Sequence, residues 1–511
     1  MESKTAFKPK LRVRVRPSTS VSVLWGIVAA TAVWLLLRQY RALQRSRPKR
    51  EVITSIREKW QHMLGLPTVI TGAYTKFNQA TFHYTTFRGR KQVVVCSSEL
   101  IAELKSAPME AMSFTAWTQE LLQCDIIFPL WSGGVRTATL PPFVSRVTFR
   151  WYKGAITKDL PKNFPFIRES VGRQLTYELV RRDGPVHDVA RNGIVGVIAR
   201  FLVGEKLSRD PEFLKMLLEV SQQIAYAGPI SSMFPQFLKS TAVKYLTRLD
   251  KTTSFVSQKL HARADAEAGQ PHEDFDFFSF GLTALERNHE ESWTVDRLIT
   301  ETFVNIFAAF HTTSMAFAVF LIEIATRPDC QKILREEAQA IIAKKGWTME
   351  AIDSMWILDS FMRETRRTRP HSDVLLNRLV MRPTTLSDGT YLAPGTHIGA
   401  AYAPRESDPR YYASPATFDP LRFYTPRINS PDPSHARFTS TDVESNEHLG
   451  FGGGKNPCPG RFFAMATIKT ALVQLLLEYE LTPGSDKMEY VCRFEEHQLP
   501  SYKDRVRFRR L

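Results

Sequence analysis

The chain has 511 residues, of which 43% are hydrophobic and 33 are phenylalanine, so it can bury one large core. Its net charge of +16 is uneven, because residues 1–50 hold 12 of the 68 Lys and Arg and one of the 52 Asp and Glu. The other 461 residues carry 56 basic and 51 acidic side chains, a net +5. The charge of residues 51–511 is therefore nearly balanced, which argues against a polyanion-binding protein, and we expect no nucleic-acid partner. The five cysteines are scattered and contain no CxxC pair, which argues against a disulfide framework.

An apolar segment, residues 21–37, lies between two basic flanks and has one Ser and one Thr as its only polar side chains. At about 1.5 Å per residue it approaches the thickness of a hydrocarbon core. A cleaved signal peptide is the competing interpretation, but its apolar region would be shorter and would follow a shorter basic segment. We therefore predict a basic leader at 1–20, a transmembrane anchor at 21–37, a basic linker with a first helical stretch at 38–66, and one large domain at 67–511. Six Lys or Arg on each side of the span leave its orientation open.

Short strands are predicted within residues 77–95, where polar and apolar side chains alternate. Helical patterns dominate from about residue 100 to 286, with breaks expected at 140–142 and 264–275. A long apolar helix is predicted at 294–325 and is ended by an Arg-Pro pair. The last quarter is predicted to hold short strands at 377–380, 391–392 and 398–400, and a final helix at 462–480. No internal repeat or second domain boundary is evident, so the predicted fold class is mainly α with small β-sheets.

A glycine- and proline-rich loop, residues 451–461, presents a single cysteine, Cys458. Three consecutive glycines allow the chain to lie flat against a planar partner, and Pro457 and Pro459 stiffen the backbone on both sides of the thiol. Because a helix is predicted to begin just after the loop, its dipole and free N–H groups should favour a thiolate. A rigid thiolate beside a flat ligand suits the axial position of a haem iron. A buried cysteine in an ordinary turn is the alternative.

The spacing of Phe451, Gly454, Cys458 and Gly460 resembles the haem-binding signature of the cytochrome P450 family, the haem-thiolate monooxygenases. The run CPGRFFA is most similar to fungal members. The resemblance implies the cytochrome P450 fold and haem b (iron protoporphyrin IX), with Cys458 as the axial ligand and Phe451 in the cofactor-binding loop. One position departs from the family pattern, because Asn456 stands where Arg or His usually reaches a haem propionate. Asparagine can still donate a hydrogen bond there but carries no charge.

The long apolar helix contains the run Ala-Ala-Phe-His-Thr-Thr at residues 308–313. A threonine hydroxyl inside a helix can bond to a carbonyl one turn back, which loosens the helix and makes room for a small ligand. The resemblance implies that this is the oxygen-binding helix, with Thr312 as the alcohol that helps to deliver protons. His311 replaces the usual acid and could relay protons, since histidine titrates near neutrality. The alternative is a histidine that is satisfied by its surroundings.

Glu364 and Arg367 are three residues apart, so on a helix they share a face and can pair. A solvated pair would be the default interpretation. With Arg422 in the later run Pro-Leu-Arg-Phe, however, they resemble the Glu-Arg-Arg triad of the family, whose role is structural. The resemblance also makes Arg378, on the following strand, a candidate for binding a haem propionate. Lys153 is the nearest candidate for the basic residue that the family places on an earlier helix. Surface charge is the alternative for Arg378, and the family pattern around Lys153 is not clean.

The residues and the resemblance together predict a membrane-anchored monooxygenase that hydroxylates, epoxidises or further oxidises a lipophilic small molecule with O2. Since the chain has no flavin or nicotinamide fingerprint, electrons must come from a partner, NADPH-cytochrome P450 reductase with cytochrome b5 as a second candidate. Its basic end could also contact lipid headgroups. Likeness to fungal and microsomal members implies a terpenoid, steroid-like or alkaloid substrate and an endoplasmic reticulum membrane, with the catalytic domain facing the cytosol. Two alternatives stay open: a haem-thiolate isomerase or dehydratase, and a non-catalytic membrane haem sensor or lipid carrier.

Overall fold

The computed structural model describes residues 52, 68–86, 89–127, 145–179, 184–269, 275–287, 293–446, 448–485, 488–489, 491–494 and 496–511. The predicted leader and anchor, almost all of the linker, and the break expected at 140–142 lie outside the described residues.

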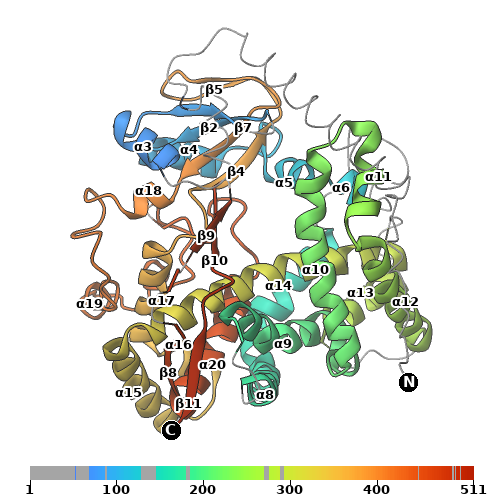
Figure 1. Cartoon of the computed structure of the whole chain (residues 1–511), viewed down its shortest axis with the longest axis vertical. Helices are drawn as coiled ribbons and strands as arrows, with labels where there is room; N and C mark the ends of the chain where they lie inside the picture. Colours follow the sequence, from blue (N-terminus) through green and yellow to red (C-terminus); the bar gives the residue numbers. More distant parts are fainter. Residues whose placement is uncertain are drawn as a thin grey trace, which may run out of the picture.

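The larger part of the molecule is a helical body built around one long helix, α14 (Val295–Ala325), which crosses the centre of Figure 1. It packs against α9 (Val186–Ser208) and α10 (Pro211–Ser232), and also against α20 (Arg461–Glu478). Helix α20 in turn packs on α8 (Leu160–Leu179). The other described helices are α3 (Thr68–Lys76), α4 (Ser98–Ser106), α5 (Phe114–Leu122), α6 (Cys124–Ile127), α7 (Arg146–Lys153), α11 (Gln236–Leu246), α12 (Leu249–Glu267), α13 (Phe277–Glu286), α15 (Pro328–Lys345), α16 (Met349–Asp353), α17 (Trp356–Thr368), α18 (Ala403–Glu406) and α19 (Tyr424–Ile428), with a π-helical turn at Gly154–Lys158 and a 3-10 turn at Ala436–Phe438.

Helix α14 owes its central place to its composition, because it is apolar on nearly every side and such helices are buried in large cores. Thr294 caps its first turn by accepting a hydrogen bond from the backbone N–H of Arg297 at 3.1 Å. Within the described part of the chain, α14 is the one helix long and apolar enough to cross a membrane, yet 56% of its most apolar stretch is buried inside the protein. It is therefore a core helix.

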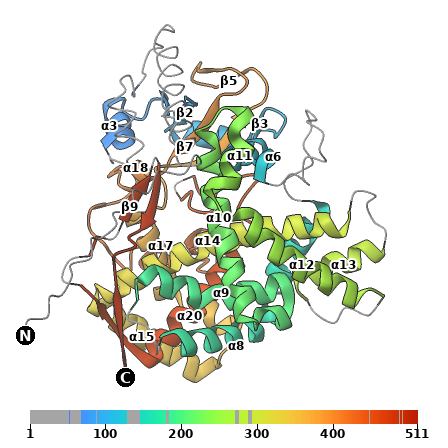
Figure 2. The same ribbon diagram turned by 45° about the vertical axis from the view of Figure 1, so that its right-hand side comes forward.

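A five-stranded sheet with the order β1-β2-β7-β4-β3 lies at one end of the molecule, and Figure 2 shows the helical body extending away from it. Strands β2 and β7 pair in parallel, with Gln92 opposite His397, and the other pairs are antiparallel. Strands from residues 82–113 and from residues 374–401 therefore share this sheet. Its strands are β1 (Phe82–Thr85), β2 (Lys91–Val95), β3 (Met112–Ser113), β4 (Val374–Val380) and β7 (His397–Ala401). Two-stranded sheets pair β5 (Thr384–Thr385) with β6 (Tyr391–Leu392), β8 (Tyr479–Pro483) with β11 (Val506–Arg510), and β9 (Val491–Phe494) with β10 (His497–Pro500).

The predicted class, mainly α with small β-sheets, is confirmed. The predicted elements differ from the structure mostly at their ends. Strand β4 begins three residues before the expected 377–380, and α12 continues to Glu267, beyond the start of the break expected at 264–275. The final helix ends at Glu478 instead of residue 480, because the chain enters β8 directly.

Candidate active site

The cysteine loop is held in one conformation by its own backbone and by α4. The N–H of Cys458 donates to the carbonyl of Phe451 at 2.8 Å, which closes the loop. Gly454 has φ +64°, and a Cβ there would lie 2.1 Å from the carbonyl oxygen of Lys105, so only glycine fits. The ammonium group of Lys105 donates to the carbonyl of Ser445 at 2.6 Å. The loop therefore rests directly on the end of α4.

Cys458 is a partly exposed residue at the start of α20, but its thiol is desolvated. Burial raises its pKa, although the backbone N–H groups of Gly460 and Arg461 and the charges of Arg461 and Arg366 lower it. The N–H groups at the helix start favour the thiolate as expected, but desolvation of the sulfur has the larger effect, so the net shift for the free side chain is upward. A thiol that coordinates a metal loses its proton outright, so ligation supplies the ionisation that the helix start does not.

The middle of α14 has an open face. Ala308 and Thr312, one turn apart, are exposed, whereas Phe310 and Thr313 beside them are buried. The Thr312 hydroxyl donates to the carbonyl of Ala308 at 2.6 Å. The helix thus presents only a methyl group and a hydroxyl on this face, and because these side chains are small, a flat cofactor can approach the backbone.

His311 is partly buried on the same helix, with its ring stacked at 6.5 Å on that of Phe307. Burial, together with positive charge on His187 and His497, lowers its pKa to about 4. At neutral pH the imidazole is therefore uncharged, so it has one nitrogen that donates and one that accepts.

Helix α7 connects to α14 one to two turns before the open face. The Tyr152 hydroxyl donates to the side-chain oxygen of Asn305, whose amide nitrogen donates to the carbonyl of Glu301 at 2.9 Å. Burial raises the pKa of Tyr152, and the negative charges of Glu301 and Cys458 add to this effect. The phenol therefore lies within electrostatic reach of the cysteine. Tyr152 and Asn305 were missed in the sequence because neither belongs to a motif.

The structure brings Glu364, Arg367 and Arg422 together. Both carboxylate oxygens of Glu364 accept from Arg367 at 2.8 Å, and one also accepts from Arg422 at 3.0 Å. The backbone N–H of Asp419 donates to the other at 3.0 Å. Arg367 also donates to the carbonyl of Glu406 at 2.7 Å. The geometry is a two-pronged buried ion pair with a third charged member, and its structural role stays a prediction.

Of the three residues predicted to contact propionates, Arg378 has the most suitable surroundings. It is buried on β4, and within the described part of the chain no carboxylate forms an ion pair with it. Its guanidinium donates to the carbonyl of Asn377 at 2.8 Å, and burial lowers its pKa to about 10. Asn456 is half-buried in the loop. Lys153 is exposed, with its ammonium group 4.7 Å from the ring of Phe149, and no described contact joins it to another predicted site residue.

Two arginines beside the cysteine also belong to the site. Arg366 on α17 places its guanidinium 4.0 Å from the ring centre of Phe451, and Arg461 donates to the carbonyl of Cys458 at 2.9 Å. Arg461 could have been found, since it is part of the CPGR run. Arg366 could not have been found in the sequence, because the Glu-x-x-Arg motif contains its neighbour Arg367 and not Arg366 itself.

These features fit haem. The loop presents a single sulfur, Arg378 supplies a buried cation without a carboxylate, and α14 offers a low face with a hydroxyl. Each is a requirement of a planar, dianionic group whose iron needs one protein ligand.

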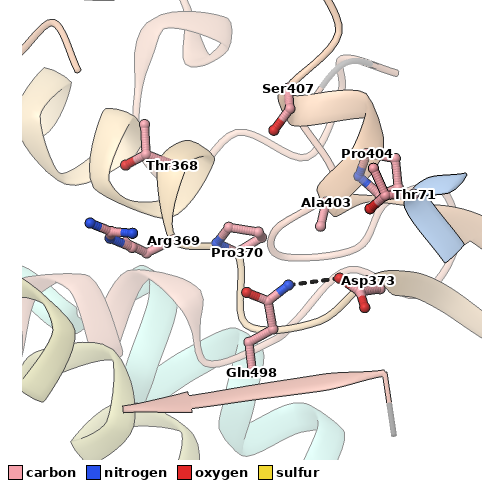
Figure 3. Close-up of a pocket in the computed structure, with 9 residues that line it drawn as sticks. All are labelled: Thr71, Thr368, Arg369, Pro370, Asp373, Ala403, Pro404, Ser407 and Gln498. Atoms are coloured by element: carbon pink, nitrogen blue, oxygen red, sulfur yellow. Dashed lines mark hydrogen bonds between the residues drawn. The ribbon is translucent and has the colours of Figure 1, made fainter. Parts of the chain in front are cut away.

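A separate pocket of about 150 Å³ lies where α17 ends, beside α3 and α18 (Figure 3). It is mostly polar, and Gln498 donates to Asp373 at 2.7 Å across it. None of the predicted site residues lines it. Its lining residues are Thr71, Thr368, Arg369, Pro370, Asp373, Ala403, Pro404, Ser407 and Gln498.

The fold is that of a known class of haem protein. The structure is similar to the retinoic acid bound cyanobacterial CYP120A1, with a TM-score of 0.66 and 18% sequence identity over 88% of this chain and 96% of that one. Residues 186–503 match the model of the family Cytochrome P450. The chain belongs to the cytochrome P450 family, and the predicted family, fold and haem b cofactor are confirmed.

Curated relatives from fungi agree with this assignment. The chain is 29% identical to Cytochrome P450 monooxygenase 71 of Postia placenta, over 84% of this chain and 87% of that protein. It is 27% identical to Cytochrome P450 monooxygenase janQ of Penicillium janthinellum (81% and 83% covered) and to Cytochrome P450 monooxygenase atmQ of Aspergillus flavus (82% and 79% covered). The chain is therefore a monooxygenase, as predicted.

Proposed function

We propose that this monooxygenase uses Cys458 as the axial ligand of its haem and oxidises a lipophilic small molecule. The observation that carries the proposal is the position of Cys458, a partly exposed residue held on a closed loop at the start of α20. Haem supplies the activation of O2 and the transfer of one oxygen atom. The chain supplies binding, orientation and protons.

Each site residue has a task in this proposal. Arg378 binds a propionate through its buried guanidinium, and Asn456 adds a neutral hydrogen bond. Thr312 holds a proton on its hydroxyl at the open face of α14, and the neutral His311 can accept and return a proton without becoming a lasting cation. Lys153 would have to leave the ring of Phe149 to reach a propionate, so its contribution stays a prediction.

The substrate, partners and location follow from the chain's chemistry. We infer a terpenoid, steroid-like or alkaloid substrate from the fungal relatives and from the apolar helix that carries the site. We also infer that residues 21–37 anchor the enzyme in the endoplasmic reticulum membrane, where NADPH-cytochrome P450 reductase, and optionally cytochrome b5, supply electrons. The length and composition of that segment and the absence of a reductase fingerprint in the sequence support this inference.

The test uses the full chain in detergent and the spectrum of its reduced carbon-monoxide complex. We expect a thiolate-type Soret band from the wild type and from Cys330→Ala, which alters a different buried cysteine, and no such band from Cys458→Ala. A thiolate-type band from Cys458→Ala would refute the ligand assignment. Turnover with reductase and NADPH tests the reaction, since product formed without electrons would instead indicate an isomerase or dehydratase.

A further inference from the structure

A buried acid and a buried histidine meet behind the cysteine loop. Glu406 ends α18 and His448 lies three residues before Phe451, and both side chains are 0% exposed. His448 Nδ1 lies 3.7 Å from Glu406 Oε1. Within the described residues, neither carboxylate oxygen and neither imidazole nitrogen makes a hydrogen bond of good geometry, and the Tyr412 hydroxyl lies close enough to Glu406 for each to affect the other's pKa. So many unpaired polar atoms in one place are unusual in a folded protein.

Burial favours the uncharged form of both side chains in this pair. Burial raises the pKa of Glu406 to about 7, despite the opposing charges of nearby arginines, and burial lowers the pKa of His448 well below its usual range. A protonated carboxyl and a neutral imidazole each have one donor and one acceptor. The groups that face the pair are Arg363, Arg366 and Arg367 from α17, Tyr402 before α18, Tyr412 after it, His371 before β4 and Lys105 from α4.

The pair joins α17 to the cysteine loop. On one side, the carbonyl of Glu406 accepts from Arg367, the partner of Glu364. On the other side, His448 is two residues from Gly450, where an added Cβ would lie 2.1 Å from the guanidinium of Arg366. Glu406 and His448 therefore both face arginines of the helix that carries the Glu-Arg-Arg cluster, and His448 belongs to the segment that leads to Cys458.

A separation of 3.7 Å is too long for a direct hydrogen bond, whereas buried polar atoms in such a place are commonly satisfied by an ordered water. We propose that Glu406 and His448 are positioning residues that share one buried water and so hold the Cys458 loop against α17. The proposal rests on the assignment of Cys458 as the haem ligand. It reaches beyond the Glu-Arg-Arg cluster, because it adds a second buried acid with a separate connection to the loop.

This arrangement makes the hold on the loop depend on pH. The pKa of Glu406 is raised above its ordinary value of 4.5, so its contribution to stability is fully present below about pH 4.5 and is lost as the pH rises through about 7. Ionisation places a desolvated negative charge among the buried groups that pack the loop against α17, and the cost of that buried charge weakens the contact. The ionised fraction of one such carboxyl grows about fivefold between about pH 6 and pH 7.

The experiment follows the loss of the thiolate-type carbon-monoxide band of the full-length holoenzyme between about pH 6 and pH 8. We expect the wild type to lose the band about five times faster at pH 7 than at pH 6. Glu406→Gln keeps the shape and hydrogen-bonding atoms but cannot ionise, so its rate should stay flat. Glu350→Gln, at a side chain that is 79% exposed, should behave as the wild type. An unchanged pH dependence in Glu406→Gln would overturn the proposal.

A second measurement separates this proposal from the assignment of the ligand. Hydrogen exchange of residues 448–458 reports on the loop without any spectrum of the haem. We expect faster exchange there in His448→Ala than in the wild type, with partial rescue in His448→Gln. Equal protection in all three proteins would sink the positioning role even if Cys458 is the ligand. If the wild type lacks the thiolate band but the two His448 variants still differ from it in exchange as expected, only the ligand assignment is refuted.

Discussion

Replacing Glu364 by glutamine tests how strongly the Glu-Arg-Arg cluster stabilises the fold. Glu364 is 0% exposed, and Arg367, its two-pronged partner at 2.8 Å, is 1% exposed. Glutamine keeps the size but removes the charge and turns a donor toward a guanidinium, so the buried Arg367 loses the carboxylate that it pairs with. Removing one member of a buried pair costs about 3–5 kcal/mol. Since whole domains are stable by about 5–15 kcal/mol, the loss is a large share of the total.

The assay is urea unfolding of the full chain in detergent, followed by tryptophan fluorescence. We expect the midpoint of Glu364→Gln to fall sharply, and that of Glu350→Gln to stay in place, because the 2.8 Å pair of Glu350 with Lys345 is solvated. Arg422→Ala should lie between them, since Arg367 still neutralises Glu364. If Glu364→Gln unfolds within about 1 kcal/mol of the wild type, the cluster contributes no more than a surface pair and the reasoning fails.

Three further predictions concern the site itself. Thr312→Val keeps the shape but removes the hydroxyl that contacts Ala308, so product per NADPH should fall by about 100-fold or more while NADPH is still consumed; an unchanged ratio contradicts the proton role. Gly454→Ala forces a clash and a strained φ of +64°, so thermal stability and haem content should both drop, whereas Gly72→Ala, on the exposed face of α3 with open space around its Cβ, should lower neither. Arg378→Met should weaken haem retention during dialysis and Arg378→Lys should restore part of it; equal retention in Arg378→Met would exclude a propionate contact.

Features that depend on neighbouring residues could be predicted from the sequence. The cysteine loop, the helix that follows it and the long apolar helix are each defined by a continuous pattern, and their bounds came within two residues. The Glu364 and Arg367 pair is equally local, because three residues on a helix bring two side chains to one face.

Features that depend on folding could not be predicted in this way. The contact of Tyr152 with Asn305 spans 153 residues, and no periodicity indicates it. The raised pKa of Cys458 is another case, since a motif places the thiol at a helix start but does not show how much solvent the fold removes. The pairing of β2 with β7 likewise needs the tertiary fold, because short apolar strands carry no signal that names their partner.

That parallel pairing has a consequence for biosynthesis. Strand β2 has four buried residues, and its partner β7 is translated about 300 residues later, so at about 5–20 residues per second β2 waits about 15–60 s for it. During that time β2 has only β1 beside it in the sheet, and the edge that later pairs with β7 stays unpaired. The contact of Lys105 with Ser445 is delayed even longer. Haem can therefore be bound in its final place only when nearly the whole chain has left the ribosome, which makes cofactor loading one of the last steps in the making of this enzyme.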